Sequence, residues 1–192
     1  VESGAARVLV HPGRYPQTFY LVSGVEVIGS GAESTIIEPP AGPAAALVTA
    51  EGAAGATLAR LTLAGAEGWD GLVAEGGVEG LTVTRCIFRD LDTALTLREG
   101  SAVEVVNNTV VRNANGLVAE GTTPVHVRNT IFAHHTGAGL RYGGSATNTY
   151  NAFWGNAVDM DPAEVSLGSL FVDPRFRSLA ANDLRLAADS PL

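Results

Sequence analysis

The chain has 192 residues, 46% hydrophobic and 17% charged, and this length and apolar content suit one domain with a buried core. Its 12 basic residues are all arginine and its acidic residues number 20, so the formal net charge of −8 argues against nucleic acids and anionic membranes as partners. No transmembrane run is present, so we expect no membrane insertion. The single cysteine, Cys86, excludes an intramolecular disulfide, and we interpret it as a small buried side chain.

Residues 1–55 are predicted to form the opening coils of the domain. Residues 39–55 are rich in proline and glycine, which favours a corner or an excursion before a more regular region.

Residues 56–156 contain a repeat with a step of 22 residues. Its blocks are 81–88, 103–110, 125–132 and 147–154, with a fifth placed at 59–63. Apolar residues alternate with polar ones inside each block, as at Val103 and Val105, which indicates strands. A fixed step of this size is typical of a solenoid.

Two further short strands are predicted in each coil. One set covers 87–88, 109–110 and 131–132, and the other covers 71–73, 94–95, 116–118 and 139–140. Because no helical pattern separates them, the expected fold is all-β, a parallel β-helix with coils of about 22 residues. Asn107, Asn129 and Asn151 share one column at a corner, and we predict that they form a buried asparagine ladder.

Residues 157–192 are predicted to close the C-terminal end of the solenoid. The 22-residue step fails beyond Trp154. We expect a loop over 159–164 and irregular strands over 169–172 and 183–186. Residues 1–192 therefore form a single predicted domain.

The stacked coils, the asparagine column and the valine-rich alternation resemble the right-handed parallel β-helix proteins of the pectate-lyase-like superfamily. The stretches 7–15 and 25–37 look like the opening coil of bacterial members, and 150–156, 171–176 and 182–192 look like their closing segment. The resemblance implies an extracellular or cell-surface location. We also expect the chain to be a trimmed piece that belongs to a longer protein or surface assembly, since Val1 is not a natural start.

Two outward columns of the first predicted sheet carry the candidate ligand-binding residues. One column runs through Arg60, Glu104, His126 and Asn148, and the other through Arg128 and Tyr150. Neighbours in a column lie about 4.8 Å apart, so we expect Glu104 to meet His126 and Arg128 to meet Tyr150. A polysaccharide could stack on the phenol and bond to the guanidinium. The alternative is an exposed strand surface that is polar only for solubility.

The sequence supports metal binding less well than it supports a ligand on the outward columns. His134 and His135 are adjacent, so their side chains point in opposite directions, and a solvated turn explains them better than a metal site. Glu75, Glu99 and Glu120 precede glycines at similar turns, where Ca²⁺ is conceivable, but their spacing is uneven. We therefore predict no cofactor.

The sequence leaves three functions open. The favoured one is a secreted or cell-surface module that binds carbohydrate or serves as a structural, adhesive rod. A polysaccharide-active enzyme is the alternative, a lyase before a glycoside hydrolase, with Arg128, His126 and Glu104 as its candidate residues. Against it, the chain has no lysine, and Glu104 has no second carboxylate in either column. The third is a subunit of a larger surface assembly.

Overall fold

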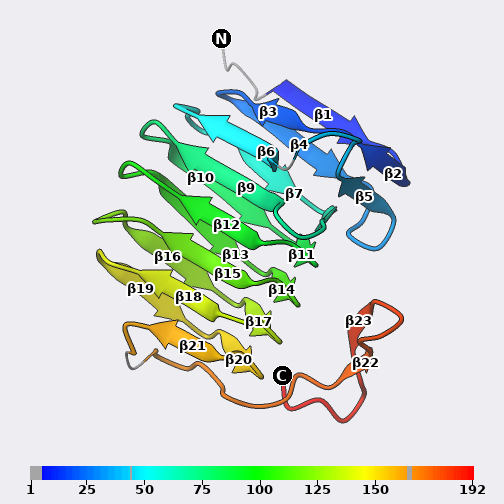
Figure 1. Cartoon of the computed structure of the whole chain (residues 1–192), viewed down its shortest axis with the longest axis vertical. Helices are drawn as coiled ribbons and strands as arrows, with labels where there is room; N and C mark the ends of the chain where they lie inside the picture. The colour runs from blue at the N-terminus through cyan, green and yellow to red at the C-terminus, as the bar shows by residue number, and fades with distance from the viewer. Residues whose placement is uncertain (1–5, 44, 164–165) are drawn as a thin grey trace.

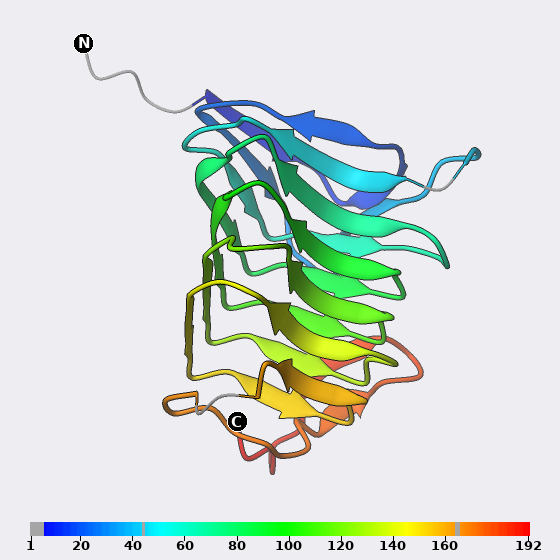
Figure 2. The same ribbon diagram turned by 60° about the vertical axis from the view of Figure 1, so that its left-hand side comes forward.

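The computed structural model describes residues 6–43, 45–163 and 166–192. The described residues form three seven-stranded parallel sheets and one two-stranded antiparallel sheet, and none of them is helical. The coils are stacked along the long axis of the molecule from the N-terminal to the C-terminal end (Figures 1 and 2). The predicted parallel β-helix is thus confirmed.

Each coil contributes one strand to each of the three parallel sheets. The first sheet contains β1 (Ala6–Val10), β4 (Val25–Gly29), β7 (Thr57–Ala59), β10 (Glu79–Thr84), β13 (Ala102–Val106), β16 (Val125–Arg128) and β19 (Ala146–Thr149). The second sheet contains β2 (Gly13–Pro16), β5 (Thr35–Glu38), β8 (Thr62–Ala64), β11 (Ile87–Arg89), β14 (Thr109–Val111), β17 (Ile131–Ala133) and β20 (Ala152–Trp154). The third sheet contains β3 (Phe19–Leu21), β6 (Ala46–Glu51), β9 (Asp70–Glu75), β12 (Thr93–Leu97), β15 (Asn115–Ala119), β18 (Ala138–Tyr142) and β21 (Val158–Asp161).

The core lies inside the coils and consists of stacked apolar columns. Val83, Val105 and Val127 are register partners in the first sheet, and each is at most 1% exposed. On the second sheet Phe132 stacks on Phe153, with ring centroids 5.4 Å apart. Burial of such columns supplies the main stabilisation of the stack, because each coil covers the apolar surface of its neighbours.

The corner between the first and second sheets turns through one residue with positive φ. These residues, with φ between 49° and 59°, are Arg60, Arg85, Asn107, Asn129 and Tyr150. The predicted ladder was wrong at Asn107 and Asn129, which are exposed at this corner. Their left-handed backbone explains the asparagines, since asparagine tolerates this conformation better than most residues.

The buried ladder follows one position later along the chain. The backbone N–H of Cys86 donates to Oδ1 of Asn108, 2.9 Å away, and the N–H of Thr130 donates to Oδ1 of Asn151 at 2.8 Å. Between them, the N–H of Asn108 donates to Oγ1 of Thr130. Of the predicted ladder only Asn151 is a member, and the structural interpretation of Cys86 is confirmed because its side chain is buried.

The corner between the second and third sheets repeats this design. Asp90, Arg112 and His134 adopt positive φ, and the residues that follow Arg112 and His134 point inward. The backbone N–H of His135 donates to Oδ1 of Asn156, so Asn156 belongs to the inner column.

Turn lengths shift the register at both ends of the repeat. Val105 pairs with Val127, 22 residues later, but Val127 pairs with Asn148, 21 residues later. At the other end Val83 pairs with Leu58, 25 residues earlier. The blocks at 59–63 and 147–154 were therefore out of register, because the intervening coils are longer or shorter than the repeat.

The C-terminal segment folds back along the second sheet. Residues 159–161 belong to β21 and not to a loop, while residue 164 of the predicted loop and residues 1–5 of the predicted opening coils lie outside the described residues. The predicted strand at 183–186 is β23 (Asp183–Leu186), which pairs with β22 (Phe176–Ser178) in a hairpin. At 169–172 the structure has no strand but only an isolated bridge through Leu170, and a second isolated bridge lies just before this range, at Leu167.

Candidate functional site

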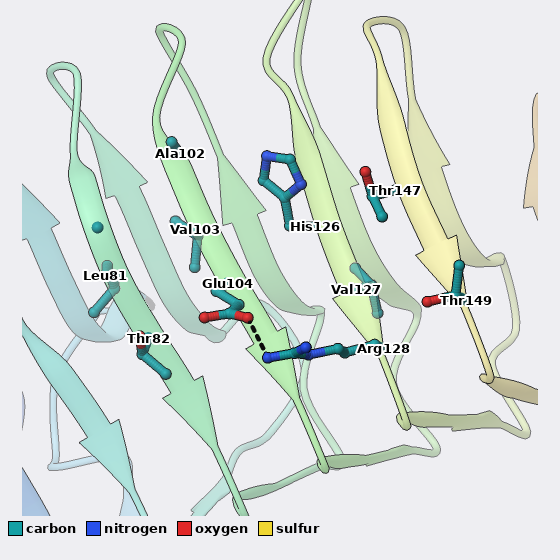
Figure 3. A pocket seen from close by; sticks show the side chains of 11 residues that line it. Leu81, Thr82, Ala102, Val103, Glu104, His126, Val127, Arg128, Thr147 and Thr149 are labelled. Atoms are coloured by element: carbon teal, nitrogen blue, oxygen red, sulfur yellow. Dashed lines mark hydrogen bonds and ion pairs between the residues drawn. The ribbon is translucent and has the colours of Figure 1, made fainter.

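The outer face of the first sheet carries a shallow, open groove of about 350 Å³. Strands β10, β13, β16 and β19 form its floor, and Figure 3 shows the side chains that line it. Strand alternation explains this lining, because every second side chain of these strands points outward while the valines between them enter the core. The polar residues of the groove are Thr82, Glu104, His126, Arg128, Thr147 and Thr149.

An ion pair lies at the centre of the groove. Nη2 of Arg128 donates to Oε1 of Glu104 across 2.6 Å, and the two side chains are 56% and 46% exposed. Arg128 is the register partner of Val106, so its side chain reaches diagonally to the neighbouring strand to meet the carboxylate. Both groups face solvent, which makes the pair worth little for stability and leaves their remaining hydrogen-bonding positions open to a ligand.

His126 stands beside this pair without joining it. It is the register partner of Glu104 on the next strand, as predicted. Figure 3 shows the ring pointing away from the Glu104 carboxylate, which turns toward Arg128 instead. The groove thus presents an imidazole and an ion pair as two separate polar groups.

The other three predicted site residues lie outside the groove. Arg60 occupies the corner after β7, where its Nη2 donates to the carbonyl oxygen of Ser30 at 3.1 Å. Asn148 points inward, is 8% exposed and accepts a 2.6 Å hydrogen bond from Nδ2 of Asn151. Tyr150 occupies a corner and lines a separate depression with Gly168 and Leu170.

The strand register explains why Asn148 and Tyr150 are absent from the groove and why Thr147 and Thr149 line it instead. His126 pairs with Thr147, and Arg128 pairs with Thr149, where a constant step had placed Asn148 and Tyr150. The sequence signal for this shift is the short turn at residues 143–145. A Cβ atom built on Gly144 would lie 2.5 Å from the carbonyl oxygen of Thr122, so this turn packs directly on the turn of the coil before it.

The acidic turns between the third and first sheets are neutralised by an arginine. Arg98 lies between two of the predicted carboxylates, with Nη1 3.4 Å from Glu75 and Nε 3.1 Å from Glu120. The third, Glu99, accepts a hydrogen bond from the backbone N–H of Gly76. Within the described ranges no group of three or more His, Cys, Asp or Glu side chains is placed to hold a metal ion.

A model of the family described as "right handed beta helix region" matches residues 23–166 of the chain. The chain belongs to this family. The match covers the later part of the opening coils and the regular coils that follow, and it assigns the right-handed sense to the stack. Among curated proteins, no match to the chain was found. The described part of the chain contains no helix long and apolar enough to cross a membrane.

Proposed function

We propose that this β-helix domain is a carbohydrate-binding module that takes a segment of a polysaccharide along the groove of the first sheet. The observation that supports the proposal is the clustering of Glu104, Arg128 and His126 with threonine hydroxyls on one exposed strand face. Such a set offers donors and acceptors to the hydroxyl or carboxylate groups of sugars. The groove is open, which suits a polymer whose chain continues beyond it on both sides.

Binding suits the arrangement better than catalysis. Glu104 is held by Arg128, and the lining of the groove contains no second carboxylate that could complete a glycosidase pair. Arg128 is a hydrogen-bond donor to Glu104, which is the role of a positioning group and not of a base. The proposal includes a secreted or cell-surface location, because polymeric glycans are met outside the cell.

The test is a binding assay on a panel of acidic and neutral polysaccharides, with and without Ca²⁺. Affinity electrophoresis would compare the wild type with Arg128→Ala, which should bind its glycan about tenfold more weakly because a charge-assisted hydrogen bond is lost. Arg141→Ala is the matched control, since Arg141 forms a similar exposed pair with Asp161 on the third sheet. Tyr150→Ala should bind like the wild type.

The same incubations distinguish the other functions. Unsaturated uronate products that disappear in Arg128→Ala would identify a lyase, and new reducing ends alone would identify a hydrolase. A panel without binding or turnover would contradict the proposal and favour a structural rod.

A further inference from the structure

A second and larger cleft lies between the second sheet and the C-terminal hairpin. Its volume is about 610 Å³. One wall comes from β2, β5, β8, β11 and β14, and the other from residues 181–185 of the hairpin. Figure 1 shows the hairpin beside the ends of β11, β14 and β17. This cleft shares no residue with the groove of the first sheet.

The hairpin wall is held in place by apolar and polar contacts. Leu184 packs in a small cluster with Val111 and Ala133 on the second sheet. Arg112 donates to the carbonyl oxygen of Leu179 and to Oδ1 of Asn182. The cleft is therefore a formed feature of the fold, with one wall anchored on the other.

The cleft gathers arginine side chains on a protein with a net charge of −8. Its lining contains four of the 12 arginines, against the two carboxylates of Glu33 and Asp183. Three of these arginines hold a carboxylate, in the pairs Arg14 with Glu38, Arg89 with Asp90, and Arg185 with Asp183. Hydroxyl and amide groups of Thr62, Thr109, Asn107 and Asn182 complete the polar lining.

The fourth arginine, Arg85, has no such partner. None of the ion pairs in the described part of the chain contains Arg85, although its backbone N–H donates to the carbonyl oxygen of Val106. Arg85 also has a φ of 53°, the backbone conformation that the two following coils fill with Asn107 and Asn129 and the preceding coil fills with Arg60. A bulky arginine is a costly choice at this corner, since left-handed backbone is unfavourable for most residues.

We propose that this cleft is an anion-binding site whose ligand is a small polyhydroxylated molecule carrying an oxyanion, either a phosphate ester or a carboxylate. Arg85 is its anchor, because an uncompensated guanidinium presents a fork of N–H donors that matches such oxygens. The cleft has the size of known ligand sites, and its hydroxyl and amide lining suits the sugar-like part of the ligand. The proposal is independent of the groove on the first sheet.

The experiment is isothermal titration calorimetry of the whole chain at low ionic strength with four probes. Glucose 6-phosphate and glucuronate represent the two oxyanions, glucose is the neutral control, and inorganic phosphate tests the bare ion. Arg85→Asn removes the charge and keeps a residue that the next coils use at the same corner. Arg141→Ala is the control. It also removes one positive charge, but Arg141 lies on the third sheet and does not line the cleft.

We expect saturable binding of glucose 6-phosphate or glucuronate, weakened at least tenfold in Arg85→Asn and unchanged in Arg141→Ala. The tighter of the two probes identifies the oxyanion. The proposal is overturned if neither probe binds, if glucose or inorganic phosphate binds as tightly as the charged sugars, or if Arg141→Ala weakens binding as much as Arg85→Asn. Circular dichroism of Arg85→Asn confirms that a loss of binding is not a loss of fold.

Discussion

The backbone N–H of Asn113 donates a hydrogen bond to ring Nδ1 of His135, 3.2 Å away, inside the corner between the second and third sheets. His135 is only 2% exposed, and its Nε2 has no hydrogen-bond partner among the described residues. Burial is the main reason why the pKa of His135 is lowered to about 4, and it outweighs the opposing effect of the backbone of Asn113, while the neighbouring His134 adds a smaller lowering effect. The ring is therefore neutral at pH 7.

We expect this histidine to make the fold sensitive to mild acid. Because its pKa is about 4 in the folded chain and 6.5 ordinarily, the unfolded chain binds more protons between these values. Stability from this group is complete above pH 6.5 and should fall by about 3 kcal/mol as the pH drops to 4. Urea unfolding of the wild type and of His135→Asn, each at about pH 6.5 and about pH 4, measures how much of the acid sensitivity comes from His135.

His135→Asn is the informative variant because asparagine already occupies the preceding position of the same inner column, Asn113. Between pH 6.5 and pH 4, the free energy of unfolding of His135→Asn should fall by about 3 kcal/mol less than that of the wild type. Equal losses in the two proteins would show that His135 is not the acid-sensitive group.

The inner and outer asparagines of the first corner should respond differently to alanine. Asn108 accepts from the N–H of Cys86 and donates to the carbonyl oxygen of Val83, each at 2.9 Å. Asn108→Ala leaves both groups buried and unpaired, so we expect a loss of about 2–4 kcal/mol in the free energy of unfolding. Asn107→Ala, at the exposed position one residue earlier, should cost about 1 kcal/mol for its left-handed backbone. Equal losses in urea denaturation would contradict the ladder.

A methyl group should not fit at Gly116. A Cβ atom there would lie 2.1 Å from the carbonyl oxygen of Gly139 and 2.8 Å from Cδ1 of Phe132. Gly116→Ala should therefore destabilise the chain by about 3 kcal/mol through overpacking. Gly121→Ala is the control, since nothing lies within 4 Å of its Cβ position and only its φ of 60° opposes alanine, at about 1 kcal/mol. Thermal unfolding that ranks Gly121→Ala as the less stable variant would refute this packing.

The thiol of Cys86 should be inert in the folded chain. Burial raises its pKa to about 12, so almost no thiolate is present at pH 8. Labelling with a disulfide reagent should be at least about 100-fold slower in buffer than in denaturing urea, because reaction requires the coil to open. Rapid labelling in buffer would place the thiol at the surface.

The sequence was sufficient to predict the strands and the stacking, because alternation and a constant step express burial directly. Val105 and Val127 pair as the 22-residue step requires. The step could not reveal that coils differ in length, and a shift of one residue moves a side chain to the opposite face. For this reason Glu104, His126 and Arg128 share the groove, while Asn148 enters the core. The predicted contacts of Glu104 with His126 and of Arg128 with Tyr150 were wrong, because Arg128 binds Glu104 and Tyr150 lies at a corner.

The arginine-lined cleft had no sequence signal. It depends on a hairpin that returns across the second sheet, and such a long-range contact leaves no periodic trace. The pair between Arg185 and Glu33, 3.8 Å apart, joins the end of the chain to its opening coils. Nothing in the local pattern near either residue indicates that they meet.

That return of the hairpin also changes how the stack should come apart. In a plain solenoid each coil touches only its neighbours, so the ends can peel away one coil at a time. Here Arg112, Glu33 and the apolar side of Leu184 tie the last residues to coils well before the final one. The hairpin connects several coils, so neither end of the stack can unfold before the hairpin contacts break. Unfolding should therefore be more cooperative than in a stack without such a hairpin.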